Sequence, residues 1–105
     1  EQPGTDSTSD DPVDMSDDVD GVVNVLIKDF TFEPGVVVVK TGQTIIWTNE
    51  DTFPHQVQTD DGSVQSAILN QGETFAHTFN VAGTYTYICG IHPAMKGTIV
   101  VSNSN

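Results

Sequence analysis

The sequence predicts an all-β fold, an antiparallel sandwich or barrel of about seven to eight strands. Short segments rich in β-branched and aromatic residues follow one another from Val22 onward, separated by turns that contain Gly, Pro, Asn or Asp. No segment shows the 3.6-residue spacing of apolar side chains that marks a helix. The chain has 105 residues, which is enough for one domain and too few for two.

Each expected strand is an apolar run that ends at a turn. Glu33-Pro34-Gly35 and Thr41-Gly42-Gln43 are clear turn signals, because Pro and Gly supply the backbone angles that tight turns require. In chain order, the strands are expected at 22–27, 30–32, 36–40, 44–49, 56–58, 74–79, 84–89 and 97–102.

Side chains alternate between the two faces of a strand, which places particular residues in the core. In strand 44–49, Asn49 shares a face with Trp47, and in strand 84–89, Cys89 shares a face with Tyr87. If the large aromatic side chains face the core, Asn49 and Cys89 point inward at the ends of their strands. His77 shares a face with two Phe residues, and we expect it to be partly buried and structural.

Residues 1–20 differ in composition from the rest of the chain. They hold eight acidic side chains and no basic one, and too few apolar groups to offset the entropy of ordering. We expect a flexible acidic leader or tether, followed by a folded domain at 21–105. The chain starts at Glu1 rather than Met. This favours a periplasmic or other extracytoplasmic protein whose targeting segment has been removed. The leader would suit a tether to a lost membrane anchor, and it would equally suit an ordinary disordered tail.

The charge excludes some classes of partner. The whole chain has 15 acidic and only three basic residues, a net charge of −12. Such a protein lacks the basic surface that binds nucleic acid or an anionic membrane. If charge selects a protein partner, that partner has a basic docking face.

The single cysteine lies in a segment with further metal-binding side chains. Taken alone, Cys89 would be a small buried hydrophobic residue. However, the segment 89–95 sets Cys89, His92 and Met95 at spacings of three, and His55 lies in the loop after Asn49. Two His and one Cys with a weak axial Met are the ligands of a blue-copper electron-transfer site.

The sequence resembles the cupredoxin family of type 1 blue copper proteins, and above all its plastocyanin and amicyanin branch. The resemblance covers residues 22–101 and is carried by Trp47-Thr-Asn49, Pro54-His55, Val57 and the segment 85–97. Only two residues separate His92 from Met95, as in amicyanins, whereas plastocyanins have a longer loop there. The resemblance implies a Greek-key β-sandwich with a short, amicyanin-type ligand loop.

The resemblance also implies the role of each site residue. His55, Cys89 and His92 match the three strong copper ligands, Met95 matches the axial ligand, and Asn49 matches a residue that braces the cysteine loop. The protein would be a monomer holding one copper ion as Cu(I) or Cu(II). It would carry single electrons through the exposed His92 to and from a c-type cytochrome, an oxidase or a reductase.

Two other functions use the same ligands. If Met95 did not bind, an open axial position would suit a small copper enzyme that acts on a nitrogen oxide. If the metal exchanged readily, the protein would store copper or deliver it. Nothing in the sequence supplies an acid–base pair for enzymatic chemistry, so an electron carrier rather than an enzyme is the preferred interpretation.

Overall fold

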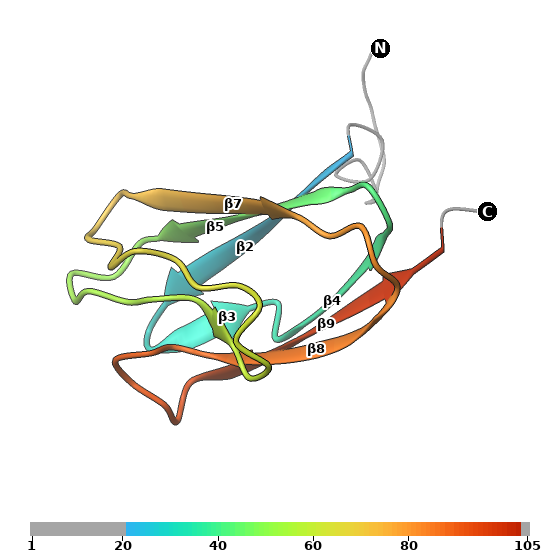
Figure 1. Cartoon of the computed structure of the whole chain (residues 1–105). Helices are drawn as coiled ribbons and strands as arrows, with labels where there is room; N and C mark the ends of the chain where they lie inside the picture. Colours follow the sequence, from blue (N-terminus) through green and yellow to red (C-terminus); the bar gives the residue numbers. More distant parts are fainter. Residues whose placement is uncertain (1–20, 104–105) are drawn as a thin grey trace, which may run out of the picture.

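The computed structural model describes residues 21–103, which fold into two four-stranded sheets packed face to face (Figure 1). The all-β prediction is confirmed, and the predicted acidic leader at 1–20 lies outside the described residues. In chain order, the strands are β2 (Val22–Lys28), β3 (Thr31–Glu33), β4 (Val36–Lys40), β5 (Thr44–Asn49), β6 (Gln58–Thr59), β7 (Thr74–Thr78), β8 (Gly83–Ile88) and β9 (Lys96–Ser102).

Strands β4 and β5 begin and end at the predicted residues, and most of the other strand ends differ by one or two residues. The largest difference is at β6, which was expected at 56–58. The amides of Gln56 and Val57 donate to the side chains of Cys89 and Ser66 instead of to a neighbouring strand. Regular pairing with β8 therefore begins only at Gln58.

The strand order is β3-β2-β5-β7 in one sheet and β4-β9-β8-β6 in the other. The prediction of antiparallel pairing is wrong for two pairs, because β2 lies parallel to β5 and β4 lies parallel to β9. The chain leaves the first sheet after β3, forms β4 in the second sheet and returns as β5. Parallel neighbours such as β2 and β5 need a crossover connection of this kind.

The core lies between the two sheets and contains the inward-facing side chains of both. Trp47 and Tyr87 are the largest fully buried side chains, and Trp47 Nε1 donates a hydrogen bond to the Tyr87 hydroxyl at 3.2 Å. Burial raises the pKa of Tyr87 to about 12, although this hydrogen bond opposes the rise. Asn49 and Cys89 are also fully buried, as the alternation of side chains predicted.

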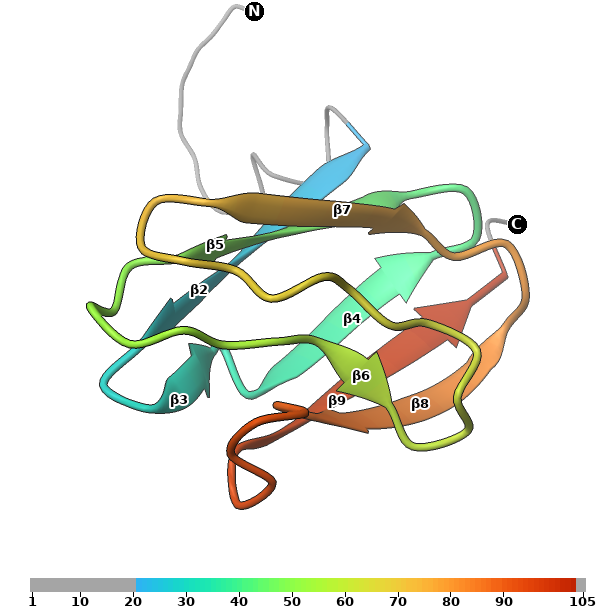
Figure 2. The same cartoon turned by 60° about the vertical axis from the view of Figure 1, so that its left-hand side comes forward.

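Different segments of the chain lie at the two ends of the sandwich. Figures 1 and 2 show the loops that follow β5 and β8 at the same end as the β2–β3 turn. Gly21 and Ser102, which lie near the two ends of the described residues, are at the other end of the sandwich, beside the turn at 41–44. There Gly21 O accepts a hydrogen bond from Thr44 N, and Ser102 O accepts one from Thr41 N, each at 2.8 Å.

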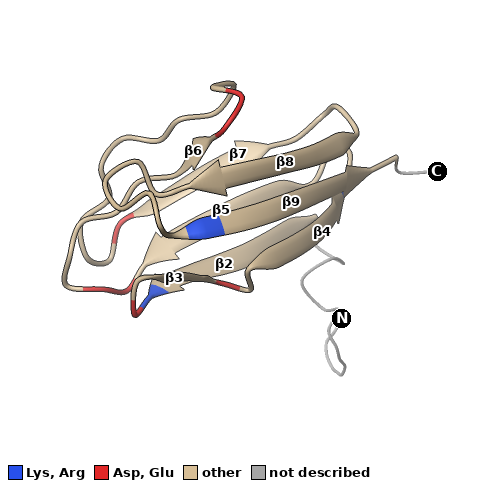
Figure 3. Ribbon diagram, turned by 90° about the horizontal axis from the view of Figure 1, so that it is seen from below, with Lys and Arg blue, Asp and Glu red and all other residues tan. Residues whose placement is uncertain are grey.

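Charged residues of the folded part are few, and most of them lie in loops and turns (Figure 3). Residues 21–103 contain seven acidic side chains and three lysines. Within this part of the chain, no helix is long and apolar enough to cross a bilayer.

Candidate metal centre

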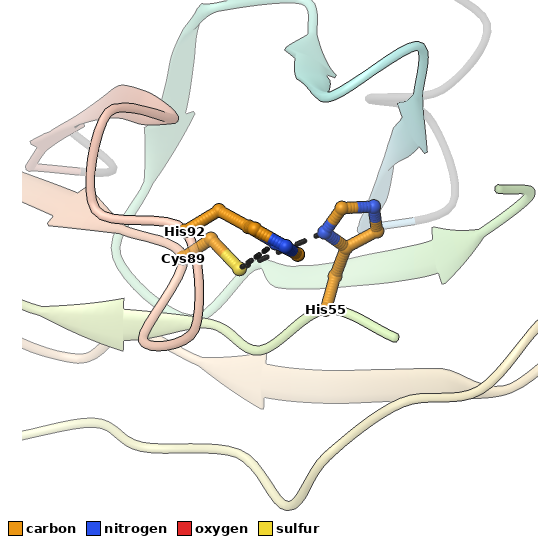
Figure 4. Close-up of side chains that lie close together, drawn as sticks. All are labelled: His55, Cys89 and His92. Carbon is orange, nitrogen blue, oxygen red and sulfur yellow. Dashed lines mark hydrogen bonds between the residues drawn. The ribbon is translucent and has the colours of Figure 1, made fainter. Parts of the chain in front are cut away.

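Three of the predicted ligands converge at the loop end of the sandwich (Figure 4). His55 lies in the loop after β5, Cys89 directly follows β8, and His92 lies in the loop that leads to β9. Cys89 Sγ lies 3.6 Å from His55 Nδ1 and 3.8 Å from His92 Nδ1. One donor atom from each residue lies within 4.8 Å of the other two.

The spacing of these donors fits one metal ion bound between them. Metal–nitrogen and metal–sulfur bonds of about 2.0 and 2.3 Å at trigonal angles place nitrogen and sulfur roughly 3.7 Å apart. The two observed separations, 3.6 and 3.8 Å, bracket that value. Two imidazoles and one thiolate in a trigonal arrangement form a donor set that suits copper. His55 and Cys89 are fully buried, so His92 is the one of the three that reaches the surface.

Asp51 orients the ring of His55. Its Oδ2 lies 2.7 Å from His55 Nε2, and because a carboxylate only accepts, Nε2 carries the proton and Nδ1 presents a lone pair to the site. The same carboxylate accepts the backbone amides of Asp29 and Phe30 at 2.7 and 3.1 Å. Burial raises the pKa of Asp51, but the hydrogen bonds from Phe30, Asp29 and His55 outweigh it and hold the pKa below its usual 3.8.

Gln56 holds the sulfur atom and was not predicted as a site residue. Its backbone N–H donates to Cys89 Sγ at 3.3 Å. A hydrogen bond to a ligand sulfur tunes the metal that the sulfur binds. Since any residue other than Pro supplies this N–H, the only signal in the sequence is that Gln56 directly follows His55.

The segment 89–95 folds back on itself as a tight loop. Met95 N donates to His92 O at 2.9 Å, and Cys89 N donates to Met95 O at 3.1 Å. Met95 is only 5% exposed. The backbone thus fixes Cys89, His92 and Met95 relative to one another.

The expected brace from Asn49 to the cysteine loop needs correction, because its hydrogen bonds go to the histidine side of the site. Asn49 Nδ2 donates to the carbonyls of Phe53 and Leu69 at 2.9 and 2.8 Å, and Asn49 Oδ1 accepts the amide of Asp51 at 2.8 Å. Leu69 in turn exchanges two backbone hydrogen bonds with His55. Alternation of side chains predicted that Asn49 points inward, but it could not predict which loop would cover its amide.

His77 lies apart from these ligands, on β7. As predicted, it is partly buried beside two Phe rings, with ring centroids 6.4 Å from Phe75 and 4.7 Å from Phe79. Among the residues that the structure describes, the cluster of metal-binding side chains is His55, Cys89 and His92.

Comparisons with known proteins agree with this geometry. A family model described as a cupredoxin-like domain matches residues 8–101. Amicyanin-alpha of Methylorubrum extorquens is 37% identical over 86 residues, which cover 77% of this chain and 72% of that protein. Plastocyanin of Scenedesmus fuscus is 40% identical over 83 residues, which cover 67% of this chain and 85% of that protein.

The fold is also similar to that of solved structures. A purple cupredoxin from Nitrosopumilus maritimus superposes with a TM-score of 0.71 and 30% identity, over 76% of this chain and 99% of that chain. The similarity therefore extends over nearly the whole of a known domain.

Proposed function

This chain belongs to the family of cupredoxin-like domains, and from that membership we propose that it is a one-electron carrier with one copper ion held by His55, Cys89 and His92. The observation that carries the proposal is the convergence of one thiol and two imidazoles at separations that suit a single metal ion. Bound copper would supply the redox chemistry, because it alternates between Cu(I) and Cu(II) and so takes up and releases one electron at a time.

The protein's own residues would keep the ligands in one arrangement. Asp51 holds the ring of His55, the Gln56 amide holds the sulfur of Cys89, and the backbone of loop 89–95 holds His92. Ligands that are already in place need little rearrangement when the charge of the site changes. A small rearrangement favours fast electron transfer.

We propose Met95 as the weak axial ligand. It lies on the same tight loop as Cys89 and His92, it is nearly buried, and a thioether is the usual weak donor in a site of this type. An axial position filled by this side chain leaves no open position for a small substrate. The arrangement therefore favours a carrier over an enzyme that acts on a nitrogen oxide.

Electrons would enter and leave through His92, which is partly exposed and has apolar neighbours. Pro54, Ile91, Pro93 and Ala94 are exposed, and an apolar patch of this kind suits the core of an interface with a partner protein. The partner would be a redox protein such as a c-type cytochrome, an oxidase or a reductase. A basic docking face on that partner would complement the excess of acidic residues.

We also propose that the protein works outside the cytoplasm, in the periplasm or an equivalent compartment, as its similarity to amicyanins suggests. Tethering to a membrane through residues 1–20 remains part of this proposal. Cell fractionation tests both parts. Native protein in the periplasmic fraction would support the location, and native protein in the membrane fraction would support the tether.

Addition of Cu(II) to the purified apoprotein tests the main proposal. We expect one equivalent to produce an intense visible band from sulfur-to-copper charge transfer, with reversible one-electron reduction. Cys89→Ser should lose this band, whereas His77→Ala, which removes a histidine outside the site, should keep it. A copper complex of the wild-type protein without a visible band would contradict the proposal.

A further inference from the structure

The ring of Phe30 contacts both histidines of the metal centre. Its centroid lies 5.2 Å from that of His92 with an interplanar angle of 88°, and 5.4 Å from that of His55 with an angle of 86°. Both pairs have the edge-to-face geometry that aromatic rings prefer. One side chain from the β2–β3 turn therefore packs against two ligands that come from different loops.

The backbone at Phe30 has an unusual conformation. Asp29 and Phe30 have φ angles of 53° and 59°, in the left-handed region that bulky residues seldom adopt. The Asp51 carboxylate holds this turn by accepting both backbone amides, and it also accepts the N–H of His55. Strain of this kind persists where surrounding contacts impose it, and it clusters at functional sites.

The position of Phe30 is not explained by the hydrophobic core. The residue is 42% exposed, and its ring contacts are His55, His92 and the exposed ring of Phe53, at 5.1 Å. A large apolar side chain in a strained turn on the surface gains little from burial in the core. Its ring instead packs against the two imidazoles.

We propose that Phe30 is a positioning residue for the metal centre, which fixes the orientation of both imidazole rings and keeps water away from the space between them. The inference rests on the proposed copper site. One thiolate gives the oxidised site a net charge of +1 and the reduced site a net charge of zero. Exclusion of water disfavours the more highly charged oxidised state, so Phe30 raises the reduction potential.

The principal variant is Phe30→Gly. Glycine adopts positive φ angles without strain, so relief of this strain opposes the loss of the ring contacts and the variant should still fold. A second variant, Phe30→Leu, keeps an apolar side chain at this position but removes the aromatic ring. Phe53→Ala is the matched control, because it removes an exposed ring that packs on Phe30 and has no ring contact with either histidine among the described residues.

Two measurements would be made on each variant. The first is the reduction potential of the copper form. The second, which needs no metal, is the NMR chemical shift of the imidazole C–H protons of His55 and His92 in the apoprotein. An aromatic ring at about 5 Å displaces these signals through its ring current, and the displacement depends on a fixed mutual orientation.

We expect Phe30→Gly to lower the potential and to remove the part of the ring-current displacement that Phe30 causes at both histidines, while the part that the two histidine rings cause in each other remains. Phe30→Leu should recover part of the potential but not the displacement, and Phe53→Ala should resemble the wild-type protein in both. Any of three results would overturn the proposal. The potentials of Phe30→Gly and wild type could be equal, or the histidine chemical shifts of Phe30→Gly and Phe53→Ala could be equal. The third is full recovery of both properties by Phe30→Leu. If the wild-type protein formed no blue copper site, the proposed function would fail, whereas the apoprotein spectra would still test the contact.

Discussion

His55 Nε2 lies 2.7 Å from Asp51 Oδ2, and the same carboxylate accepts the backbone amides of the β2–β3 turn. A single side chain thus joins a buried ligand to the turn that covers the site. The three N–H groups that donate to Asp51 use both of its carboxylate oxygens. An amide side chain at this position would offer only one acceptor.

Asp51→Asn is therefore expected to weaken copper binding by about 10- to 100-fold, the usual effect of losing a group that orients a ligand. Competition with a chelator of known affinity measures this change. Glu50→Gln is the matched control, since it removes the same charge from the neighbouring exposed residue. Equal affinities of the two variants would show that charge, rather than orientation of His55, is what matters.

Gln56→Pro is expected to lower the reduction potential, because it removes the N–H that lies 3.3 Å from Cys89 Sγ. The positive end of that dipole stabilises the electron-rich thiolate, most strongly in the reduced site. We expect a shift on the order of tens of millivolts, since 59 mV corresponds to about 1.4 kcal/mol for one electron. Gln56→Ala keeps the N–H and loses the side-chain bond to Ser66, so voltammetry of both variants separates the two contacts. Equal potentials for the Pro and Ala variants would contradict this role of the amide.

Met95→Leu tests the axial position. The two side chains have similar volumes, so the substitution should cost less than about 1.5 kcal/mol of the free energy of unfolding. Loss of a weak donor to the oxidised site should raise the reduction potential and change the visible and EPR spectra of the Cu(II) form. Spectra and potential identical to those of the wild-type protein would show that Met95 only packs in the loop.

Gly97→Ala is expected to destabilise the fold. A methyl group at Gly97 would overlap the ring of Tyr87, which is fully buried and lies opposite Gly97 across the β8–β9 pair. Overpacking of a core of this kind costs about 1–3 kcal/mol, which urea unfolding would measure. In Gly35→Ala the new methyl would meet its nearest atom at 3.9 Å, an ordinary contact, so this control should be nearly neutral. Similar losses in both variants would mean that the contact with Tyr87 is not the cause.

Asp61 predicts a dependence of stability on pH. Hydrogen bonds from the Ser63 amide, the Ser63 hydroxyl and the Thr59 hydroxyl lower its pKa below the usual 3.8. Its pKa is thus lower in the folded than in the unfolded chain, so its contribution is present above the unfolded value and is lost as the pH falls through the folded value. Asp61→Asn should lower the melting temperature at neutral pH, and the difference from wild type should shrink in acid. A difference that stays constant down to pH 3 would contradict this assignment.

Local patterns in the sequence predicted much of this site. The two-residue alternation of strands placed Asn49 and Cys89 in the core, and three-residue spacings placed Cys89, His92 and Met95 on one loop. These features depend on neighbours in the chain. Local geometry is sufficient to predict them.

The features that local patterns did not predict all depend on contacts between distant segments. The parallel pairing of β2 with β5 results from a crossover between the sheets. The packing of Phe30 on both histidines depends on a turn that Asp51 fixes from 21 or more residues away. In the sequence Phe30 is simply the first apolar residue of a short strand.

The positions of Gly21 and Ser102 have a consequence for how the folded part can be attached to a surface. Gly21 and Ser102 both lie beside the turn at 41–44, at the end of the sandwich opposite the loop after β8, which contains His92. An electrode, a bead or a second protein attached directly at either of these two residues would therefore leave the His92 face pointing outward. Molecules immobilised in this way would share one orientation, and their heterogeneous electron-transfer rates could be compared from one variant to the next.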